Sequence, residues 1–198
     1  PALAAYDRAI ALPPNDGEFW ASRGDVLHHL DRSPEALENY DTALGLDPKD
    51  ARSWSNRGNT LMALSRFEEA LASHDKAIAL NGELADAYHN RSHVRLLVGD
   101  FARGFEDYEW RKLIDQSVGD RNFDKPLGLG AQSIAGKAIL VHDEQGLGDA
   151  IQFSRYLTLL NEAGARVLFA PRGKLVRLMR TLKADFELVD PRDRSLSF

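Results

Sequence analysis

Residues 51–84 read ARSWSNRGNTLMALSRFEEALASHDKAIALNGEL, and the same order of residue types recurs 34 positions earlier and 34 positions later. Each copy carries a large aromatic residue, a small residue four positions on, a second small residue, and an aromatic residue or histidine, and the first two copies also share a leucine. The columns that keep this step are Trp20, Trp54 and Tyr88; Gly24, Gly58 and Ser92; Ala36, Ala70 and Gly104; Tyr40, His74 and Tyr108; and Leu12, Leu46 and Leu80. So many columns in register indicate a repeat architecture.

Each repeat unit is predicted to contain two helices. The small residues let the two helices approach closely, because larger side chains there would push them apart. The aromatic residues fill the volume between units, and Pro14 and Pro48 end the second helix of a unit. No single unit can bury its own apolar face, so neighbouring units must stack. A period of about 34 residues with these landmarks resembles the tetratricopeptide repeat (TPR).

Residues 1–115 are therefore predicted to form a TPR α-solenoid. Residues 1–16 match only the second half of a unit, and full units follow at 17–50, 51–84 and 85–115. Because the chain begins in mid-repeat, and with proline rather than methionine, we expect it to be a piece of a longer protein. The second helix of the last unit is predicted to carry Arg111 where the earlier units have alanine, which indicates that the stack ends there.

The composition favours a soluble protein of the cytoplasm. The chain has no cysteine, which excludes disulfide bonds and cysteine-based metal sites or nucleophiles. No apolar run approaches the roughly 18 residues that span a bilayer, so no membrane partner is expected. Residues 1–115 carry 13 Lys and Arg against 20 Asp and Glu, a net charge of −7. An acidic solenoid argues against nucleic acid as a partner.

The chain changes character after Asp115. Residues 116–136 contain four glycines and no helical period, so they are predicted to be a connector. In residues 137–198, short apolar runs alternate with helical patterns, which is typical of a βαβαβ unit with a parallel sheet. The predicted fold class is mostly α: a TPR solenoid followed by a partial α/β, Rossmann-like unit.

A glycine loop, EQGLGD at 144–149, lies between the first predicted strand and the following helix. Backbone N–H groups at such a helix start can hold a phosphate or another anion, and Gly146 and Gly148 let the backbone approach a ligand. The alternative is a tight turn in which Asp149 is favourable in the first helical turn. His142, at the end of the predicted strand, either contacts a phosphate or an acceptor or is purely structural.

The order of these segments resembles the bacterial TPR-containing glycosyltransferases. The resemblance rests on the TPR array, YEWR at 108–111, GKAILVH at 136–142 and EQGLGDAIQFSRY at 144–156. These proteins are similar in layout to the O-linked N-acetylglucosamine transferases. Their catalytic part is similar to the heptosyltransferase branch of the GT-B fold, which has two Rossmann-like halves. The resemblance implies that residues 137–198 are part of the N-terminal, acceptor-side half.

The same resemblance implies roles for single residues. Asp149 matches a loop carboxylate proposed as the general base on the acceptor hydroxyl, and Gly146 and Gly148 match the loop glycines. A nucleotide sugar would be the donor of the whole transferase. This chain lacks the second half and a Trp-x-Gly element before Gly136, so we expect no cofactor and no sugar transfer here. The incomplete sheet is expected either to self-associate through its open edges or to be covered by a segment such as the 116–136 connector.

Asparagines mark the predicted concave groove. Asn56 and Asn90 are equivalent in successive first helices, and Asn59 lies one turn after Asn56. The resemblance to O-linked N-acetylglucosamine transferases implies a ladder that grips a peptide backbone, since an amide both donates and accepts. The alternative is a row of solvated polar side chains. His89 and His93 have a zinc-like spacing, but two ligands do not make a site, so no metal is predicted.

Two functions remain open at this point. The chain is either a scaffold that binds a peptide or protein partner in its groove as part of a larger glycosyltransferase, or purely a protein–protein interaction module with a non-catalytic α/β appendage. The two differ in whether a second Rossmann-like half follows in the whole protein.

Overall fold

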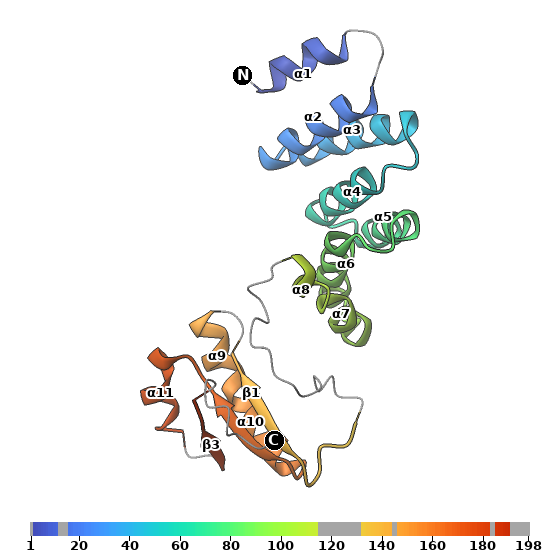
Figure 1. The fold of residues 1–198 in the computed structure, drawn as a ribbon. Coiled ribbons are helices and arrows are strands. Elements are labelled where there is room, and N and C mark those ends of the chain that lie inside the picture. Colours follow the sequence, from blue (N-terminus) through green and yellow to red (C-terminus); the bar gives the residue numbers. More distant parts are fainter. Residues whose placement is uncertain (1, 12–15, 115–131, 144–145, 183–184, 191–198) are drawn as a thin grey trace. The chain divides into compact units, whose positions relative to one another are not determined.

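The computed structural model describes residues 2–11, 16–114, 132–143, 146–182 and 185–190, and Figure 1 shows its helices and strands. The chain divides into two compact units, residues 1–116 and 117–198. The proposed connector at 116–136 lies largely outside the described residues. Among the described residues, no helix is both long enough and apolar enough to cross a membrane.

The first unit is a mostly helical, TPR-like solenoid. Helix α1 packs on α2, and the pairs α2–α3, α4–α5 and α6–α7 follow, each in contact with the next pair. The helices are α1 (Ala2–Ile10), α2 (Gly17–His29), α3 (Ser33–Leu46), α4 (Ala51–Ala63), α5 (Phe67–Leu80), α6 (Ala85–Leu97), α7 (Phe101–Tyr108) and α8 (Arg111–Ile114).

The turns inside each pair keep the 34-residue step. Asp31, Ser65 and Gly99 connect the first helix to the second, and all three have a positive φ, of 57°, 58° and 85°. Glycine adopts this left-handed conformation freely, whereas aspartate and serine adopt it at a cost. The first helices of the earlier pairs begin in the same way, because the side chains of Asp16 and Asp50 accept hydrogen bonds from the backbone two residues on.

Glycine on the first helix and a ring on the second make the close contact inside a pair. A Cβ placed on Gly24 would lie 3.0 Å from the ring of Tyr40, and one on Gly58 would lie 2.5 Å from the ring of His74. Both rings are buried in consequence. The rings of Tyr40 and His74 occupy the space that side chains at positions 24 and 58 would fill. This explains why the sequence has glycine at both positions.

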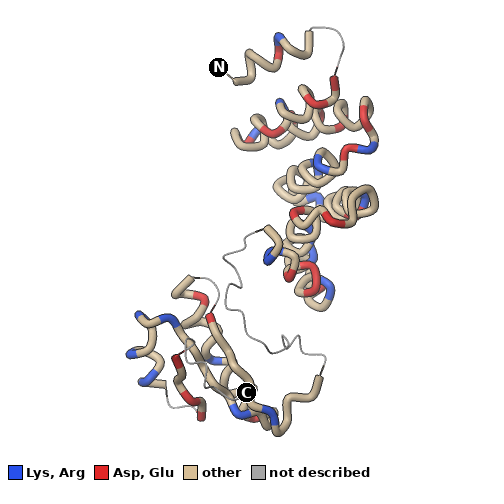
Figure 2. Tube along the Cα trace, in the orientation of Figure 1, with Lys and Arg blue, Asp and Glu red and all other residues tan. Residues whose placement is uncertain are grey.

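A row of arginines ties each first helix to two second helices. Each arginine is bonded to an aspartate of the preceding second helix and to a polar residue of its own second helix. The sets are Asp7–Arg23–Asn39, Asp41–Arg57–Ser73 and Asp75–Arg91–Asp107, and all three columns keep the 34-residue step. We call these sets the arginine clamps. Figure 2 shows acidic and basic residues on neighbouring helices of the solenoid.

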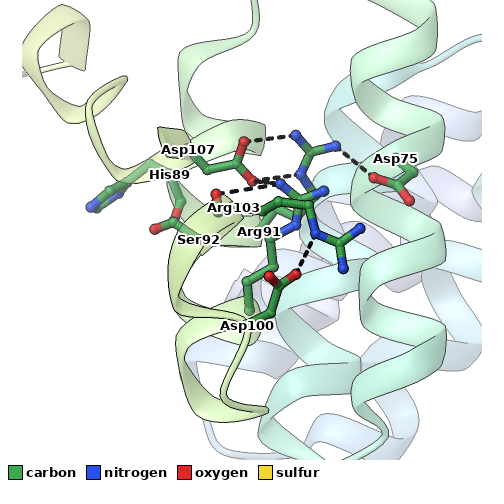
Figure 3. A network of polar contacts seen from close by, with 8 residues as sticks. Asp75, His89, Arg91, Ser92, Asp100, Arg103 and Asp107 are labelled. Carbon is green, nitrogen blue, oxygen red and sulfur yellow. Dashed lines mark hydrogen bonds and ion pairs between the residues drawn. The ribbon is translucent and has the colours of Figure 1, made fainter. Parts of the chain in front are cut away.

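The third clamp is the most highly charged. Asp107 is 5% exposed and accepts two hydrogen bonds from Arg91, at 2.7 and 2.8 Å, and one from Arg95 at 2.8 Å. Asp75 binds the remaining side of Arg91 at 2.6 Å. Figure 3 shows this network together with the nearby Asp100–Arg103 ion pair. A buried carboxylate of this kind depends on its partners.

The last pair departs from the earlier ones, although not as expected. Helix α7 has 8 residues, whereas α3 and α5 have 14. Arg111 was expected in the second helix, but α7 ends at Tyr108 and Arg111 begins α8, so that expectation was wrong. Helix α8 lies against α6, and Trp110 stacks on Tyr88 with ring centroids 3.9 Å apart. The last helix pair, α6 and α7, is therefore followed by the 4-residue helix α8.

The second unit contains a three-stranded parallel sheet. Its order is β1–β2–β3, and Ala138 pairs with Arg166 while Val167 pairs with Phe186. The predicted helix after β1 is divided by a 3₁₀ turn. The elements are β1 (Ala138–His142), α9 (Leu147–Phe153), η1 (Ser154–Tyr156), α10 (Leu157–Glu162), β2 (Arg166–Ala170), α11 (Gly173–Met179) and β3 (Phe186–Leu188).

One apolar cluster holds the second unit together. Val167 and Phe169 of β2 pack with Leu157 of α10 and with Leu175 and Met179 of α11. Because Val167 and Phe169 lie on the same face of the strand, α10 and α11 cover one face of the sheet. This burial supplies the main stabilisation of the α/β unit.

The arginine clamps predict a graded loss of stability. Arg23→Ala removes an exposed ion pair and is expected to lower the free energy of unfolding by about 1 kcal/mol. Arg91→Ala leaves Asp107 buried with a single cation and is expected to cost about 3 kcal/mol. Urea denaturation followed by circular dichroism measures both. Equal losses for the two variants would contradict the role assigned to Asp107.

Candidate functional site

The first helices touch one another through polar side chains. Asn56 on α4 donates to Asp25 on α2 at 2.9 Å, and Asn90 on α6 is 3.5 Å from the hydroxyl of Ser55 on α4. Thr60 lies 3.3 Å from His28 in a third such contact. We call the side chains along this line of contacts the polar row. Asn56 and Asn90 occupy equivalent positions of successive units, whereas the residues that they contact, Asp25 and Ser55, do not.

The polar row begins with a complete set of three groups. The hydroxyl of Tyr40 donates to Oδ1 of Asp25 at 2.5 Å, and the same oxygen accepts from Asn56. Burial, with the carboxylate beside it, raises the pKa of the Tyr40 phenol, which therefore stays protonated and remains a donor. These three side chains connect α2, α3 and α4 at one point.

The next unit repeats this arrangement with two changes, and its hydrogen bonds are lost. His74 stands where Tyr40 stands in the preceding unit, and Asn59 stands where Asp25 stands. The amide oxygen of Asn59 is buried and has no hydrogen-bond partner among the described residues, and both ring nitrogens of His74 are in the same condition. An imidazole lacks the outer hydroxyl of tyrosine, so it does not reach the amide as tyrosine reaches the carboxylate.

The structure thus brings two of the predicted groove residues into direct helix–helix contacts. Asn56 and Asn90 each face the preceding first helix, as their equal positions require, and Asn59 lies beside them without a partner. Contact of these amides with a peptide stays a prediction. Sequence reasoning identified Tyr40 as a repeat landmark but missed its hydrogen bond to Asp25, which accompanies the Gly24–Tyr40 contact.

The two histidines of α6 form an aromatic cluster with Tyr108. The rings of His89 and His93 meet edge to face at 4.5 Å, and Tyr108 packs on both. The guanidinium of Arg111 lies 4.4 Å from the Tyr108 ring. Burial lowers the pKa of both histidines. Within the part of the chain that the structure describes, no group of three potential metal ligands occurs.

A pocket of about 350 Å³ lies between α1 and α2. It is beside the first member of the polar row. Its lining residues are Tyr6, Ser22, Asp25, Val26, His29 and Leu30. The pocket therefore combines a carboxylate, two hydroxyls and aliphatic surface.

In the α/β unit, the predicted site residues gather beyond the end of β1. His142 is the last residue of β1, and Gly146 immediately precedes α9. Gly148 and Asp149 lie in the first turn of α9 and are exposed. A Cβ on Gly146 would lie 3.3 Å from a carboxylate oxygen of Asp149, so that carboxylate is turned back toward the start of the helix.

A second carboxylate at this edge was missed by the sequence analysis. Asp143 directly follows β1 and is buried, and its Oδ2 lies 2.9 Å from Nε of Arg172, which follows β2. The distance is that of an ion pair, although the angles do not satisfy a hydrogen bond. The carboxyl ends of the two parallel strands are therefore joined by opposite charges, which only the adjacency of β1 and β2 could reveal.

Comparison with known families identifies the repeats. Residues 24–65 match a family model described as TPR repeat, and residues 51–84 match one described as tetratricopeptide repeat. No curated protein matches the chain. The chain therefore contains TPR repeats, as the 34-residue period predicts.

Several solved structures are similar to part of this chain. The crystal structure of MamA is 24% identical with a TM-score of 0.53, covering 58% of this chain and 67% of that chain. The TPR2B domain of yeast Sti1, in a complex with pHsp70, is 27% identical with a TM-score of 0.48, covering 52% and 83%. The second TPR of Spaghetti (RPAP3), bound to an HSP90 peptide, is 23% identical with a TM-score of 0.48, covering 50% and 93%.

The buried imidazole of His74 predicts that the free energy of unfolding depends on pH. Burial lowers the pKa of His74 to about 4, and the nearby Arg91 adds to the effect. Above about pH 6.5 the imidazole is neutral in both states. As the pH falls from about 6.5 to about 4, His74 is protonated in the unfolded chain but stays neutral in the folded chain. The free energy of unfolding therefore decreases over this pH range.

Replacing His74→Tyr is expected to remove that dependence and to provide a hydroxyl for Asn59. At about pH 5 the variant should gain roughly 2 kcal/mol over wild type beyond its gain at neutral pH. His74→Phe also removes the titration but leaves Asn59 unpaired, so it should be about 1 kcal/mol less stable than His74→Tyr. Denaturant unfolding at several pH values measures this. An unchanged pH profile in both variants would contradict the buried, neutral imidazole.

Proposed function

We propose that the TPR array is a scaffold that holds an extended peptide segment of a partner protein along α2, α4 and α6. The observation that carries the proposal is that Asn56 and Asn59 of α4 and Asn90 of α6 have partly exposed side chains on neighbouring first helices. A primary amide can donate to a peptide carbonyl and accept from a peptide N–H. The long contact of Asn90, at 3.5 Å, leaves that amide weakly bonded.

The chemistry of the polar row favours a peptide backbone over an apolar helix. An amphipathic helix needs an apolar groove, whereas the row consists of amides, hydroxyls, imidazoles and a carboxylate. Amides donate to a carbonyl and accept from an N–H of the same backbone. The row should therefore hold peptides of different sequence in an extended conformation.

Substitution of the two weakly bonded amides tests this function. Peptides are first selected on the 198-residue chain from a random, unstructured library. The double variant Asn59→Ala/Asn90→Ala should then bind each selected peptide roughly tenfold or more weakly, because backbone hydrogen bonds are lost whatever the sequence. Isothermal titration calorimetry gives the Kd values.

The matched control is Asn81→Ala. Asn81 is exposed in the turn after α5, where its side chain accepts from the backbone of Glu83. This variant should bind the peptides like wild type. Wild-type affinity in the double variant, with unchanged helicity, would rule out the polar row as the peptide site.

As a second candidate, we propose that in a longer protein the α/β unit is the acceptor side of a Rossmann-like glycosyltransferase that uses a nucleotide sugar. The observation that favours this is the position of Asp149, which is exposed just beyond the carboxyl end of β1. Open parallel sheets bind ligands at that edge. A carboxylate there can take the proton of an acceptor hydroxyl as it attacks a sugar, with Gly146, Gly148 and His142 around it.

Asp149→Asn in the longer protein tests this candidate. The substitution keeps the size of the side chain and removes the base, so sugar transfer should fall by about 10²–10⁴. The melting temperature should stay nearly the same. If Asp149 only supports the helix start, the variant should lose at most about 1 kcal/mol of stability and keep its turnover, which would remove the catalytic assignment.

A further inference from the structure

The side chains on the first helices change their chemistry on α6. Helix α4 carries Ser55 and Asn59, and α6 carries His89 and His93 at the equivalent positions, 34 residues later. His93 lies one turn after Asn90, so it is on the same side of α6 as that amide. Where α4 has a hydroxyl and an amide, α6 therefore has two imidazoles. We call His89 and His93 the histidine pair.

The ring nitrogens of the histidine pair are within reach of a ligand. Both side chains are partly exposed, and their ring centroids are 4.5 Å apart. Among the residues that the structure describes, no group hydrogen-bonds a ring nitrogen of either histidine, and none of these nitrogens is fully buried. Figure 3 shows the His89 ring directed away from the network of Arg91 and Asp107. The pair can therefore donate to a bound peptide.

The surroundings of the histidine pair contain few charges. Every helix that packs against α6 contributes at least one polar group near the pair. The titratable and charged groups are His74 of α5, Asp86 of α6, Tyr108 of α7 and Arg111 of α8, and α4 contributes the uncharged Ser55 beside Asn90.

These surroundings make the histidine pair neutral at neutral pH. Burial lowers the pKa of both rings, and for His89 the neighbouring His93 and Arg111 act in the same direction, against Asp86. The pair is therefore neutral at about pH 7.5 and takes up a proton only in acidic solution. Because two adjacent imidazolium ions repel each other, one proton is taken up before the other.

A carboxylate is the ligand group that matches a protonated imidazole, because it accepts a charge-assisted hydrogen bond. We propose that the histidine pair selects an acidic residue of the bound peptide at the α6 end of the polar row, and that the pair takes up a proton when that residue binds. The inference rests on the proposed peptide site along α2, α4 and α6, and it names one feature of the ligand. The amides bind a backbone of any sequence, whereas the histidine pair adds a preference at one position.

The preference for an acidic residue depends on pH in a defined direction. A bound carboxylate raises the pKa of the imidazole that it contacts. The gain in affinity is therefore complete below the pKa of the free pair and is lost as the pH rises through the pKa of the complex. A glutamate of the peptide stays ionised at about pH 5.5. His74, whose pKa is about 4, is neutral at that pH and does not contribute.

A paired series of peptides is the probe. The tightest peptide from the library selection is synthesised with either Glu or Gln at one position at a time, and calorimetry gives each Kd at about pH 7.5 and about pH 5.5. At one position, the Glu peptide should gain about fivefold to tenfold over the Gln peptide when the pH is lowered. Calorimetry in buffers of different ionisation enthalpy should show uptake of up to about one proton for that Glu peptide only.

A double variant and a matched control make the test specific to the histidine pair. His89→Ser/His93→Asn places the residues of α4 on α6, so the pH-dependent preference for Glu should disappear, whatever the affinity for the Gln peptide. Asn81→Ala, in the exposed turn after α5, should keep the preference. Circular dichroism at both pH values shows whether each variant is folded.

Two results would overturn the inference. One is the same ratio of Glu to Gln affinity at both pH values in the wild-type chain. The other is a pH-dependent preference that the double variant retains. Either result leaves the peptide site intact, because Asn59→Ala/Asn90→Ala tests that site separately. Failure to select any peptide would refute the peptide site and this inference with it.

Discussion

The contacts between helices in the solenoid depend on the hydrogen bonds and ion pairs of one arginine in each first helix. Arg23, Arg57 and Arg91 each bind an aspartate of the preceding second helix and a polar residue of their own second helix. One arginine therefore connects a first helix with two second helices, across the boundary between units. The same contacts recur with the 34-residue step and accompany the steric contacts inside each pair.

The helix arrangement is the same in the first two full units, but residue differences between them change the hydrogen bonds between the first and second helices. The first full unit has tyrosine and aspartate at the inner junction and bonds them to Asn56. The next has His74 and Asn59 and leaves both without partners. This junction is destabilising, because buried polar groups without hydrogen bonds cost free energy.

The repeat units could be predicted from the sequence because each landmark has a local steric reason. Gly24, Gly58 and the rings opposite them are visible as columns. The clamps keep the same step but were missed, since an aspartate and an arginine 16 residues apart carry no signal until α1 and α2 are seen side by side. The left-handed Asp31 and Ser65 were missed because neither residue type requires that conformation.

The α/β unit shows the same limit more strongly. Its parallel strands were predictable from apolar runs, whereas the Asp143–Arg172 pair appears only once β1 and β2 are adjacent. The break of the long predicted helix into α9, η1 and α10 has no clear mark in the apolar pattern, which continues through Phe153 and Tyr156. Asp149 was found because a glycine loop precedes it, but its chemistry depends on what faces this edge.

We propose that a peptide ligand binds to the polar row on the first helices. The most direct measurement follows the side-chain NH₂ resonances of the asparagines by NMR while a selected peptide is added. We expect saturable shifts for Asn56, Asn59 and Asn90, with Asn81 and Asn161 unchanged. Shifts confined to Asn81 or Asn161, with the three amides of the row unaffected at saturation, would contradict it.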